Sequence, residues 1–394
     1  MFNIIIAGLT SLLTDISTEM VYPLLPLFLT TRLGASPAIV GIIEGIAEST
    51  ASILKVFSGA ISDKIGKRKP LAIGGYSFST LGKLSLVFAR SWHMVLWGRI
   101  LDRFGKGIRT APRDALIAES SHEGERGAAF GLHRLMDSLG ASIGIILAYY
   151  LVTSYKGDYA KVFLYSVIPA VLGVACLFFI REKPGYRPRE NKGFHLSLNW
   201  KALDPRLRAF LIVTFIFTLG NSSNQFLLLR AENIGVSPST VILLYLTYNL
   251  VYTAVSYPAG KLSDRIGRRT LLVLGYLAYG LVYLGFAFVK SPSALWALFG
   301  TYGLYIGFTE GVEKALVSDI APPDQKATLI GLHATLVGIG LFPASTLAGF
   351  LWKAYGPRAP FFFGGAMGLL AAFGLWWVLR DKDISRSLDV AREC

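Results

Sequence analysis

Charged side chains are concentrated in one stretch of the chain, Trp97 to Asp114, which reads WGRILDRFGKGIRTAPRD. The stretch holds five bases and two acids, although long apolar segments flank it on both sides. If it is one helix, a turn of about 100° per residue places all seven charges within a wedge of about 140°. The seven are Arg99, Asp102, Arg103, Lys106, Arg109, Arg113 and Asp114. One face of the predicted helix is therefore charged and the other is apolar.

Four acids near the N-terminus form two pairs with a spacing of four residues. Asp15 and Glu19 make one pair, and Glu44 and Glu48 make the other. On a helix the members of such a pair share one face. Four carboxylates cannot all stay ionised in a low dielectric without partners, so burial and repulsion favour protonation of some of them, whereas nearby bases favour ionisation of others. These acids are candidate proton carriers, and a structural ion-pair network is the alternative. Three further residues could join either arrangement: His133, Arg134 and Asp137.

The chain around these charges is too apolar for a soluble domain. Of its 394 residues, 53% are hydrophobic and only 16% are charged. A charged side chain that faces lipid at the bilayer centre costs about 2.5 kcal/mol or more, so the charged face must look onto protein or a water-filled cavity. The net charge of +14 does not indicate nucleic-acid binding, because the bases lie mostly in short loops between apolar runs. The composition predicts an integral membrane protein with a polar pathway along this helix.

Twelve apolar stretches of about 20 residues or more are long enough to span a membrane. We expect the first six at about 3–31, 38–61, 70–89, 93–118, 127–153 and 160–180, and the second six at about 208–229, 238–262, 270–289, 294–320, 327–352 and 359–379. The predicted domains are two six-helix bundles (1–180 and 208–380), a polar linker (181–207) and a charged tail (381–394). With the linker and both termini in the cytoplasm, most loop bases are cytoplasmic, as the positive-inside rule requires. The first span has no basic segment or cleavage site before it, so we expect it to be retained.

The two halves of the sequence repeat each other. Six positions recur about 201 residues later: Gly59, Ser62, Asp63, Ile65, Gly66 and Arg68 return as Gly260, Ser263, Asp264, Ile266, Gly267 and Arg269. The tripeptide Gly-Leu-His at 131–133 returns at 331–333, one residue out of that register. Parallel halves of six spans, related by an axis along the membrane normal, are an architecture built for alternating access.

The loops GAISDKIGKRK at 59–69 and GKLSDRIGRR at 260–269 resemble the signature of the major facilitator superfamily between helices 2 and 3 and between helices 8 and 9. The resemblance covers the whole chain. It implies an all-α fold of twelve transmembrane helices in two pseudo-symmetric bundles, placed in the inner membrane of a prokaryote. It also makes the signature residues part of a cytoplasmic latch, for which a solvated charged turn is the alternative. The residues concerned are Gly59, Asp63, Gly66, Arg68, Gly260, Asp264, Gly267 and Arg269.

A second family signature is similar to part of the charged stretch. Arg103, Lys106, Gly107 and Ala111 match a pattern in which an intramembrane arginine on helix 4 is associated with proton coupling, although Arg109 stands where the pattern has glycine. The segment GASIG at 140–144 partly matches the antiporter signature but lacks its proline. A glycine packing face explains that segment equally well. The resemblance implies proton-coupled export by antiport.

The second half carries fewer intramembrane charges, chiefly Glu310 and Glu313 on the span at 294–320. Its polar residues are mostly neutral, and they are suited to a neutral or amphipathic portion of a substrate. The candidates are Asn221, Asn224, Gln225, Tyr245, Tyr248 and Asn249. Aromatic residues at helical spacing often only pack, which is the alternative for the tyrosines.

The sequence therefore favours a proton-coupled secondary transporter that exports a small organic or amphipathic compound. We expect helices 1, 4, 7 and 10 to line its cavity. We also expect an ion pair between Asp15 or Glu19 and one of three bases: Arg103, Lys106 and Arg109. The expected partners are a small-molecule substrate and the bilayer, with no nucleic acid, no cofactor beyond the proton gradient and no resident metal, and we expect a monomer.

Two other functions remain open at this stage. Divalent-metal efflux would use Asp15, Glu19, Glu44, Glu48 and His133 as ligands, but the nearby bases and the lack of a His or Cys cluster weigh against it. A non-transporting membrane receptor is the second. An enzyme is disfavoured because the sequence shows no nucleophile with a base, no metal-ligand pattern and no phosphate loop. The two cysteines, Cys176 and Cys394, make no disulfide framework.

Overall fold

The computed structural model describes residues 2–65, 68–121, 126–181, 200, 203–322 and 326–379, and these residues are almost entirely helical. The first half consists of α1 (Phe2–Val21), α3 (Pro37–Ile65), α4 (Lys69–Val87), α5 (Trp92–Ser120), α6 (Arg126–Ser154) and α7 (Tyr159–Leu177). The second half consists of α8 (Pro205–Gly220), α9 (Gln225–Asn233), α10 (Pro238–Ile266), α11 (Arg268–Phe288), α12 (Pro292–Ile320), α13 (Lys326–Tyr355) and α14 (Ala359–Val378). Twelve spans were predicted, and the observed bounds match them to within a few residues, with α8 and α9 together forming the seventh.

The described helices also have the composition of membrane spans. Nine of them are long and apolar enough to cross a bilayer by themselves. The helices at 69–87, 92–120 and 292–320 fall outside that set. The first and third of these hold basic or acidic residues, and the second is the charged helix predicted from the sequence. Most of the predicted linker and all of the tail at 381–394 lie outside the described residues, so their assignment stays a prediction.

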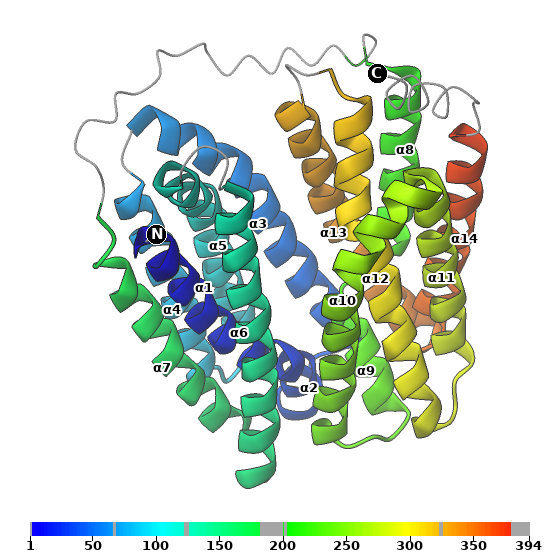
Figure 1. Ribbon diagram of the computed structural model, residues 1–394. Helices are drawn as coiled ribbons and strands as arrows, with labels where there is room; N and C mark the ends of the chain where they lie inside the picture. The colour runs from blue at the N-terminus through cyan, green and yellow to red at the C-terminus, as the bar shows by residue number, and fades with distance from the viewer. Residues whose placement is uncertain are drawn as a thin grey trace.

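The six helices of each half form a bundle, and the two bundles stand side by side (Figure 1). We call the side of the molecule where α3 ends at Ile65 and α10 ends at Ile266 the signature face, and the side where these helices begin the opposite face. Helices α3 and α13 of the two bundles converge near the opposite face and diverge toward the signature face (Figure 1).

Small residues allow α3 and α13 to touch near the opposite face. A Cβ atom on Gly41 would lie 2.2 Å from the carbonyl oxygen of Ser345, so only glycine fits there. The Ser49 hydroxyl donates a hydrogen bond of 2.9 Å to the carbonyl oxygen of Gly338. These contacts all involve the first half of α3, so the two bundles are closed against each other on the opposite face.

Glycines also fix the orientation of the charged helix α5. A Cβ on Gly105 of α5 would lie 2.3 Å from the carbonyl oxygen of Gly75 on α4, and a Cβ on Gly82 of α4 would lie 2.6 Å from the backbone nitrogen of Asp102. Such close backbone contact holds the small-residue face of α5 against α4. The face that carries the bases is therefore turned toward α1, α3 and the second bundle.

Two spans are interrupted near the middle of the molecule. The first continues beyond α1 through 3₁₀, α and π turns from Tyr22 to Arg32, which include Pro23 and Pro26. The seventh is not the continuous helix that was predicted at 208–229, because α8 ends at Gly220 and α9 begins at Gln225. The intervening Asn-Ser-Ser-Asn segment carries side chains that compete with the helical backbone for hydrogen bonds. Broken helices at this level are common at transporter binding sites.

The internal repeat changes register inside the signature loop. Helices α3 and α10 are 201 positions apart, but α5 and α12 are 200 apart. The predicted match of Arg68 with Arg269 was therefore wrong, because Arg68 is equivalent to Arg268. Each arginine binds a serine five or six residues before it and an acid near the end of α5 or α12. Arg68 donates to Ser62 at 2.7 Å and to Glu119 at 3.3 Å, and Arg268 donates to Ser263 and, at 3.3 Å, to Asp319.

Candidate functional site

A cavity of about 420 Å³ lies between the two bundles. Helices α1, α5, α8 and α12 provide most of its wall, which confirms the prediction for helices 1, 4, 7 and 10. Glu48 of α3, Tyr245 of α10 and two apolar residues of α13 complete it. The sequence-predicted residues that line it are Asp15, Glu19, Glu48, Arg103, Lys106, Arg109, Asn221, Asn224, Tyr245, Glu310 and Glu313.

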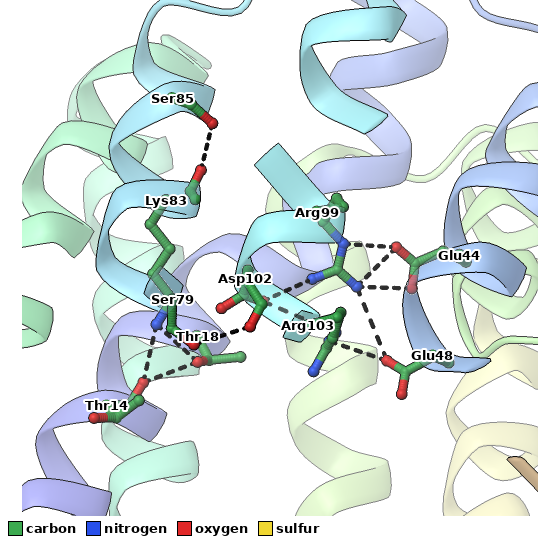
Figure 2. Close-up of polar contacts among 11 residues, drawn as sticks. Thr14, Thr18, Glu44, Glu48, Ser79, Lys83, Ser85, Arg99, Asp102 and Arg103 are labelled. Carbon is green, nitrogen blue, oxygen red and sulfur yellow. Dashed lines mark hydrogen bonds and ion pairs between the residues drawn. The ribbon is translucent and has the colours of Figure 1, made fainter. Parts of the chain in front are cut away.

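An ion-pair network connects α3 to α5 beside the cavity (Figure 2). The Arg99 guanidinium donates through Nε and Nη2 to the two oxygens of Glu44, both at 2.9 Å. Asp102 lies 3.4 Å from the same arginine. Arg103 reaches Glu48 at 3.1 Å. Glu44 was predicted to face the cavity but is fully buried behind it, because Arg99 draws it into the contact between the two helices.

A buried lysine joins α4 to α1 on the other side of this network (Figure 2). The Lys83 ammonium donates to the Thr18 hydroxyl at 2.9 Å and to the Thr14 carbonyl oxygen at 3.3 Å. The sequence-based list of site residues omitted Lys83, since its partners lie on a helix far away in the chain. The alternating small and polar residues of α4 did not indicate which helix the Lys83 side chain would face.

The acids of α1 are placed in the cavity, but without the predicted base. Glu19 accepts a hydrogen bond of 3.0 Å from the Tyr245 hydroxyl. Within the described ranges, no ion pair of 4.0 Å or less joins Asp15 or Glu19 to any base. The predicted ion pair to α5 was thus wrong for this conformation. Arg103 is held by Glu48 instead, and the Arg109 guanidinium lies over the ring of Tyr76, 4.1 Å from its centre.

Three other predicted residues gather on Ser11 of α1, outside the cavity lining. Arg113 donates to the Ser11 hydroxyl at 3.1 Å, and Nε2 of His133 lies 2.8 Å from the same oxygen. Asp137 lies 3.4 Å from Nδ1 of His133. This cluster connects α1, α5 and α6 next to the cavity, on the side toward the signature face.

Arg134 lies at the contact between the bundles. It donates to the hydroxyl of Tyr252 and lies 3.7 Å from Glu310, both in the second half. Tyr252 donates in turn to Glu310 at 2.6 Å. A second cavity, of about 260 Å³, is lined by these three residues, by Lys314 and by glycines of α10 and α12.

Tyrosine hydroxyls position the two asparagines at the break between α8 and α9. Tyr302 donates to Oδ1 of Asn224 at 2.7 Å, and Asn221 donates to the Tyr305 hydroxyl at 3.1 Å. Asn224 also donates to Tyr248 at 3.3 Å. Tyr248 therefore supports the site from behind and does not line the cavity. Tyr302 and Tyr305 do line it, and the sequence analysis missed both because their spacing on α12 resembled ordinary packing.

Besides Tyr248, two predicted substrate residues do not reach the cavity. Gln225 is fully buried at the start of α9, and its amide has no hydrogen-bond partner among the described residues. Asn249 donates to the backbone oxygen of Tyr245 at 2.9 Å. Both were chosen for polarity within an apolar run, which does not show the direction of a side chain.

Glu313 has a tyrosine and a histidine as its neighbours, in place of a lysine or arginine. The Tyr276 hydroxyl donates to it at 2.9 Å, and Nε2 of His333 lies 3.3 Å from its other oxygen. Tyr276 and His333 are the repeat equivalents of Tyr76 and His133, 200 positions on, and both were missed. In the first half, Tyr76, His133 and Arg113 all lie within hydrogen-bond distance of the Ser11 hydroxyl.

The signature residues are described more fully in the second half. Asp264 lies 2.6 Å from Arg268, Gly267 has a φ of +89° that favours glycine, and Arg269 donates to the carbonyl oxygen of Trp376. Gly260 borders the second cavity. In the first half, Gly66 and the surroundings of Gly59 and Asp63 lie outside what the structure describes.

The geometry gives the metal-efflux alternative no support. Among the residues that the structure describes, no three His, Cys, Asp or Glu side chains come together in a group that could hold a metal ion. Of the proposed ligands, Glu44 and Glu48 are engaged by arginines.

Comparisons with known proteins agree with this architecture. The family model of the Major Facilitator Superfamily matches residues 7–228 and 210–392. An uncharacterised MFS-type transporter of Methanocaldococcus jannaschii is 37% identical over 382 residues, which cover 95% of this chain and 94% of that protein. Multidrug resistance protein MdtH of Klebsiella pneumoniae is 26% identical over 377 residues, covering 92% and 90%.

Among solved structures, the nucleoside transporter NupG has a similar fold. The two superpose with a TM-score of 0.81 at 13% sequence identity, over 97% of this chain and 100% of that one. Because the family model matches both halves and the archaeal relative is 37% identical over nearly the whole chain, the chain belongs to the major facilitator superfamily and is a multi-pass membrane transporter, not an enzyme.

Proposed function

We propose that this transporter is proton-coupled and exports a small organic or amphipathic compound by antiport. The observation that carries the proposal is the placement of Asp15 and Glu19. Both line the central cavity of a membrane transporter, and neither has a base within ion-pair distance among the described residues. A carboxylate in a low dielectric without a cationic partner is easier to protonate, so these acids can load a proton where the cavity is open.

Coupling follows if the acids exchange partners as the bundles rock. Lys106 and Arg109 also line the cavity, on the neighbouring helix α5. One of these bases can pair with Asp15 or Glu19 once the proton has left, and it would then favour the ionised acid. Export by antiport requires that the acids take up protons in the outward-facing state and release them to the cytoplasm in the inward-facing state, when substrate takes their place.

The present conformation corresponds to one state of that cycle. The bundles meet near the opposite face, through Ser49 and Gly338, and diverge toward the signature face. With the signature face in the cytoplasm, as the loop bases predict, this is the inward-facing state. Substrate would enter from the cytoplasm here and compete with protons for the cavity.

Relatives support export and a prokaryotic membrane. MdtH of Klebsiella pneumoniae is named a multidrug resistance protein, a name that fits efflux, and the relatives compared here are archaeal and bacterial. We therefore place this chain in the cell membrane of a prokaryote, the inner membrane where there are two. Since one chain supplies both walls of the cavity, we propose that the monomer is the functional unit, with the proton gradient as its only energy source.

The test is paired flux in proteoliposomes, with the substrate first found by a counterflow screen of purified protein. Asp15→Asn and Glu19→Gln should abolish uphill transport driven by a pH gradient and leave exchange at equal pH partly intact, because exchange needs no change in protonation. Asp158→Asn, on an exposed acid at the opposite face, is the matched control. If both cavity variants still transport uphill at wild-type rates, the acids are structural and the proposal fails.

A further inference from the structure

We infer that the substrate is a zwitterion whose ammonium group binds at the α1 acids and whose carboxylate binds at the α5 bases. This inference rests on the proposed transport function and names the substrate class of the same cavity. Four charged groups carry it, namely Asp15, Glu19, Lys106 and Arg109. All four line the cavity, and none forms an ion pair with another described residue within 4.0 Å.

The basic pole is marked by donors that have no acceptor. Arg109 is only 6% exposed, and its Nη1 has no hydrogen-bond partner in the described structure. Its guanidinium is held by the Tyr76 ring, which leaves the edge free to donate. The Lys106 ammonium, one turn earlier on α5, has no hydrogen bond or ion pair to a described residue. Two adjacent cationic donors without acceptors match the two oxygens of a carboxylate.

The acidic pole lies on the neighbouring helix. The Asp15 carboxylate has no ion pair or hydrogen bond to any described residue. Among these residues, the Glu19 carboxylate accepts a side-chain hydrogen bond only from the Tyr245 hydroxyl. The remaining acids of the first-half wall are already neutralised, since Glu48 pairs with Arg103 and Asp102 with Arg99. Asp15 and Glu19 are thus the acids that an ammonium group can engage there.

Opposite the two poles, the second half offers an aromatic surface. Its two acids are held by their own neighbours, Glu310 by Lys314 and Glu313 by Tyr276 and His333. Tyr302 and Tyr305 line this side of the cavity, and their hydroxyls are already engaged by Asn224 and Asn221. Phe217 lies beside them, with its ring centre 6.0 Å from that of Tyr305. Such a surface fits a flat or apolar body attached to the charged head.

Charge balance favours a zwitterion over an ion of one sign. A cation would leave the two bases unmatched, and an anion would leave the two acids unmatched, at a cost of several kcal/mol for each buried charge. A zwitterion completes both poles and keeps the first-half wall of the cavity neutral. Its ammonium group also competes with protons for Asp15 and Glu19, which is what antiport requires.

The experiment measures ligand-induced thermal stabilisation of the purified full-length protein at equal pH, without any gradient. The probes share an aryl body and differ only in charge: L-phenylalanine as zwitterion, phenethylamine as cation and 3-phenylpropionate as anion, together with the corresponding indole and phenol series. We expect the zwitterion of at least one series to raise the melting temperature at millimolar concentration, and its cation and anion to have less effect.

Variants then report which pole holds which charge. Lys106→Gln should remove the preference for zwitterion over cation, whereas Asp15→Asn and Glu19→Gln should remove the preference for zwitterion over anion. Lys106→Arg, which keeps the charge, should restore the wild-type preference. Lys161→Gln, on an exposed lysine at the start of α7, should leave it unchanged.

Three results would overturn the inference. In the first, a cation or an anion raises the melting temperature as much as the zwitterion of its series. In the second, none of the zwitterions raises the melting temperature. In the third, the variants lose the same amount of stabilisation with all three charge forms. Because no pH gradient is involved, a failure here leaves proton coupling open. Conversely, loss of uphill transport in the flux assay says nothing about charge preference, so the two proposals can fail separately.

Discussion

Arg99 of α5 and Glu44 of α3 form a two-armed ion pair with both side chains buried, 2.9 Å apart at each arm. The pair holds the charged helix against α3 at the level of the cavity wall (Figure 2). Because Arg99 also contacts Asp102, one guanidinium neutralises two buried acids. This leaves Arg103 available for Glu48.

Glu44→Gln should destabilise the protein, because the buried Arg99 charge would then keep only Asp102 as its close acidic partner. We expect a loss of about 3–5 kcal/mol, as for other buried pairs broken on one side. Thermal unfolding of the purified protein measures it. Glu48→Gln is the comparison, since Glu48 is 29% exposed and solvent can replace part of its pair with Arg103. Equal losses for the two variants would contradict the assignment of Arg99 and Glu44 as the structural pair.

Gly41→Ala should loosen the closure at the opposite face. The added Cβ would lie 2.2 Å from the Ser345 carbonyl oxygen, so α3 and α13 must separate, at a cost of about 1–3 kcal/mol. A cysteine at Asn221, in a background without the two native cysteines, should then react faster with an impermeant thiol reagent added from that side. Gly74→Ala is the control, because nothing lies within 4 Å of its Cβ position. The same reaction rate in both variants would show that this contact does not close the carrier.

The sequence predicted the architecture well because a membrane requires apolar segments of a fixed length and keeps charged faces away from lipid. Apolar runs of the right length gave the twelve helices, and the charged wedge of α5 had to face protein or water. That reasoning placed Arg103 and Lys106 in the cavity, where the structure has them. The register shift between the halves was also visible, since Gly-Leu-His repeats at 200 positions and not at 201.

The pairing of charges could not be predicted in the same way. Whether Arg103 meets Glu48 or Glu19 depends on the rotation and height of three helices, and a change of one residue turns a side chain by about 100°. Lys83 was missed for that reason, because its partners Thr14 and Thr18 lie on another helix. The break at Asn221–Asn224 did have a signal, since two serines between two asparagines after Gly220 favour local hydrogen bonds over a helix.

Asp264→Asn should shift the carrier toward the inward-facing state. In the present conformation the one described ion pair of Asp264 is with Arg268 of its own half, as expected of an open latch. If the latch closes in the outward-facing state, Asp264→Asn removes a charged hydrogen bond from that state. The outward-facing state then loses about 1–3 kcal/mol of stability. We expect the equivalent Asp63→Asn to act in the same direction. The accessibility of a cavity cysteine from each face reports the shift, with Asp158→Asn as control. An unchanged labelling pattern would exclude a gating role.

Glu313 and His333 should form a second proton site that adds to the one on α1. The carboxylate lines the cavity, has His333 at 3.3 Å and the Tyr276 hydroxyl at 2.9 Å, and has no lysine or arginine nitrogen within 4.0 Å among the described residues. A proton can therefore be shared between the acid and the imidazole without a fixed cation to displace. Within the described structure, the charged groups nearby on the same helix are Glu310 and Lys314, which pair with each other.

Glu313→Gln should then reduce the number of protons exchanged for each substrate and not abolish coupling. Each proton moved down a gradient of one pH unit supplies about 1.4 kcal/mol, which is about a tenfold accumulation. With the membrane potential clamped to zero, two protons support about a 100-fold gradient of a neutral or zwitterionic substrate, and one proton about a tenfold gradient. We expect Glu313→Gln and His333→Asn each to lower the steady-state accumulation of substrate about tenfold. Glu19→Gln should remove the accumulation altogether. Accumulation at the wild-type level in both C-half variants would show that this pair only supports α12, and that protons are carried by the first half alone.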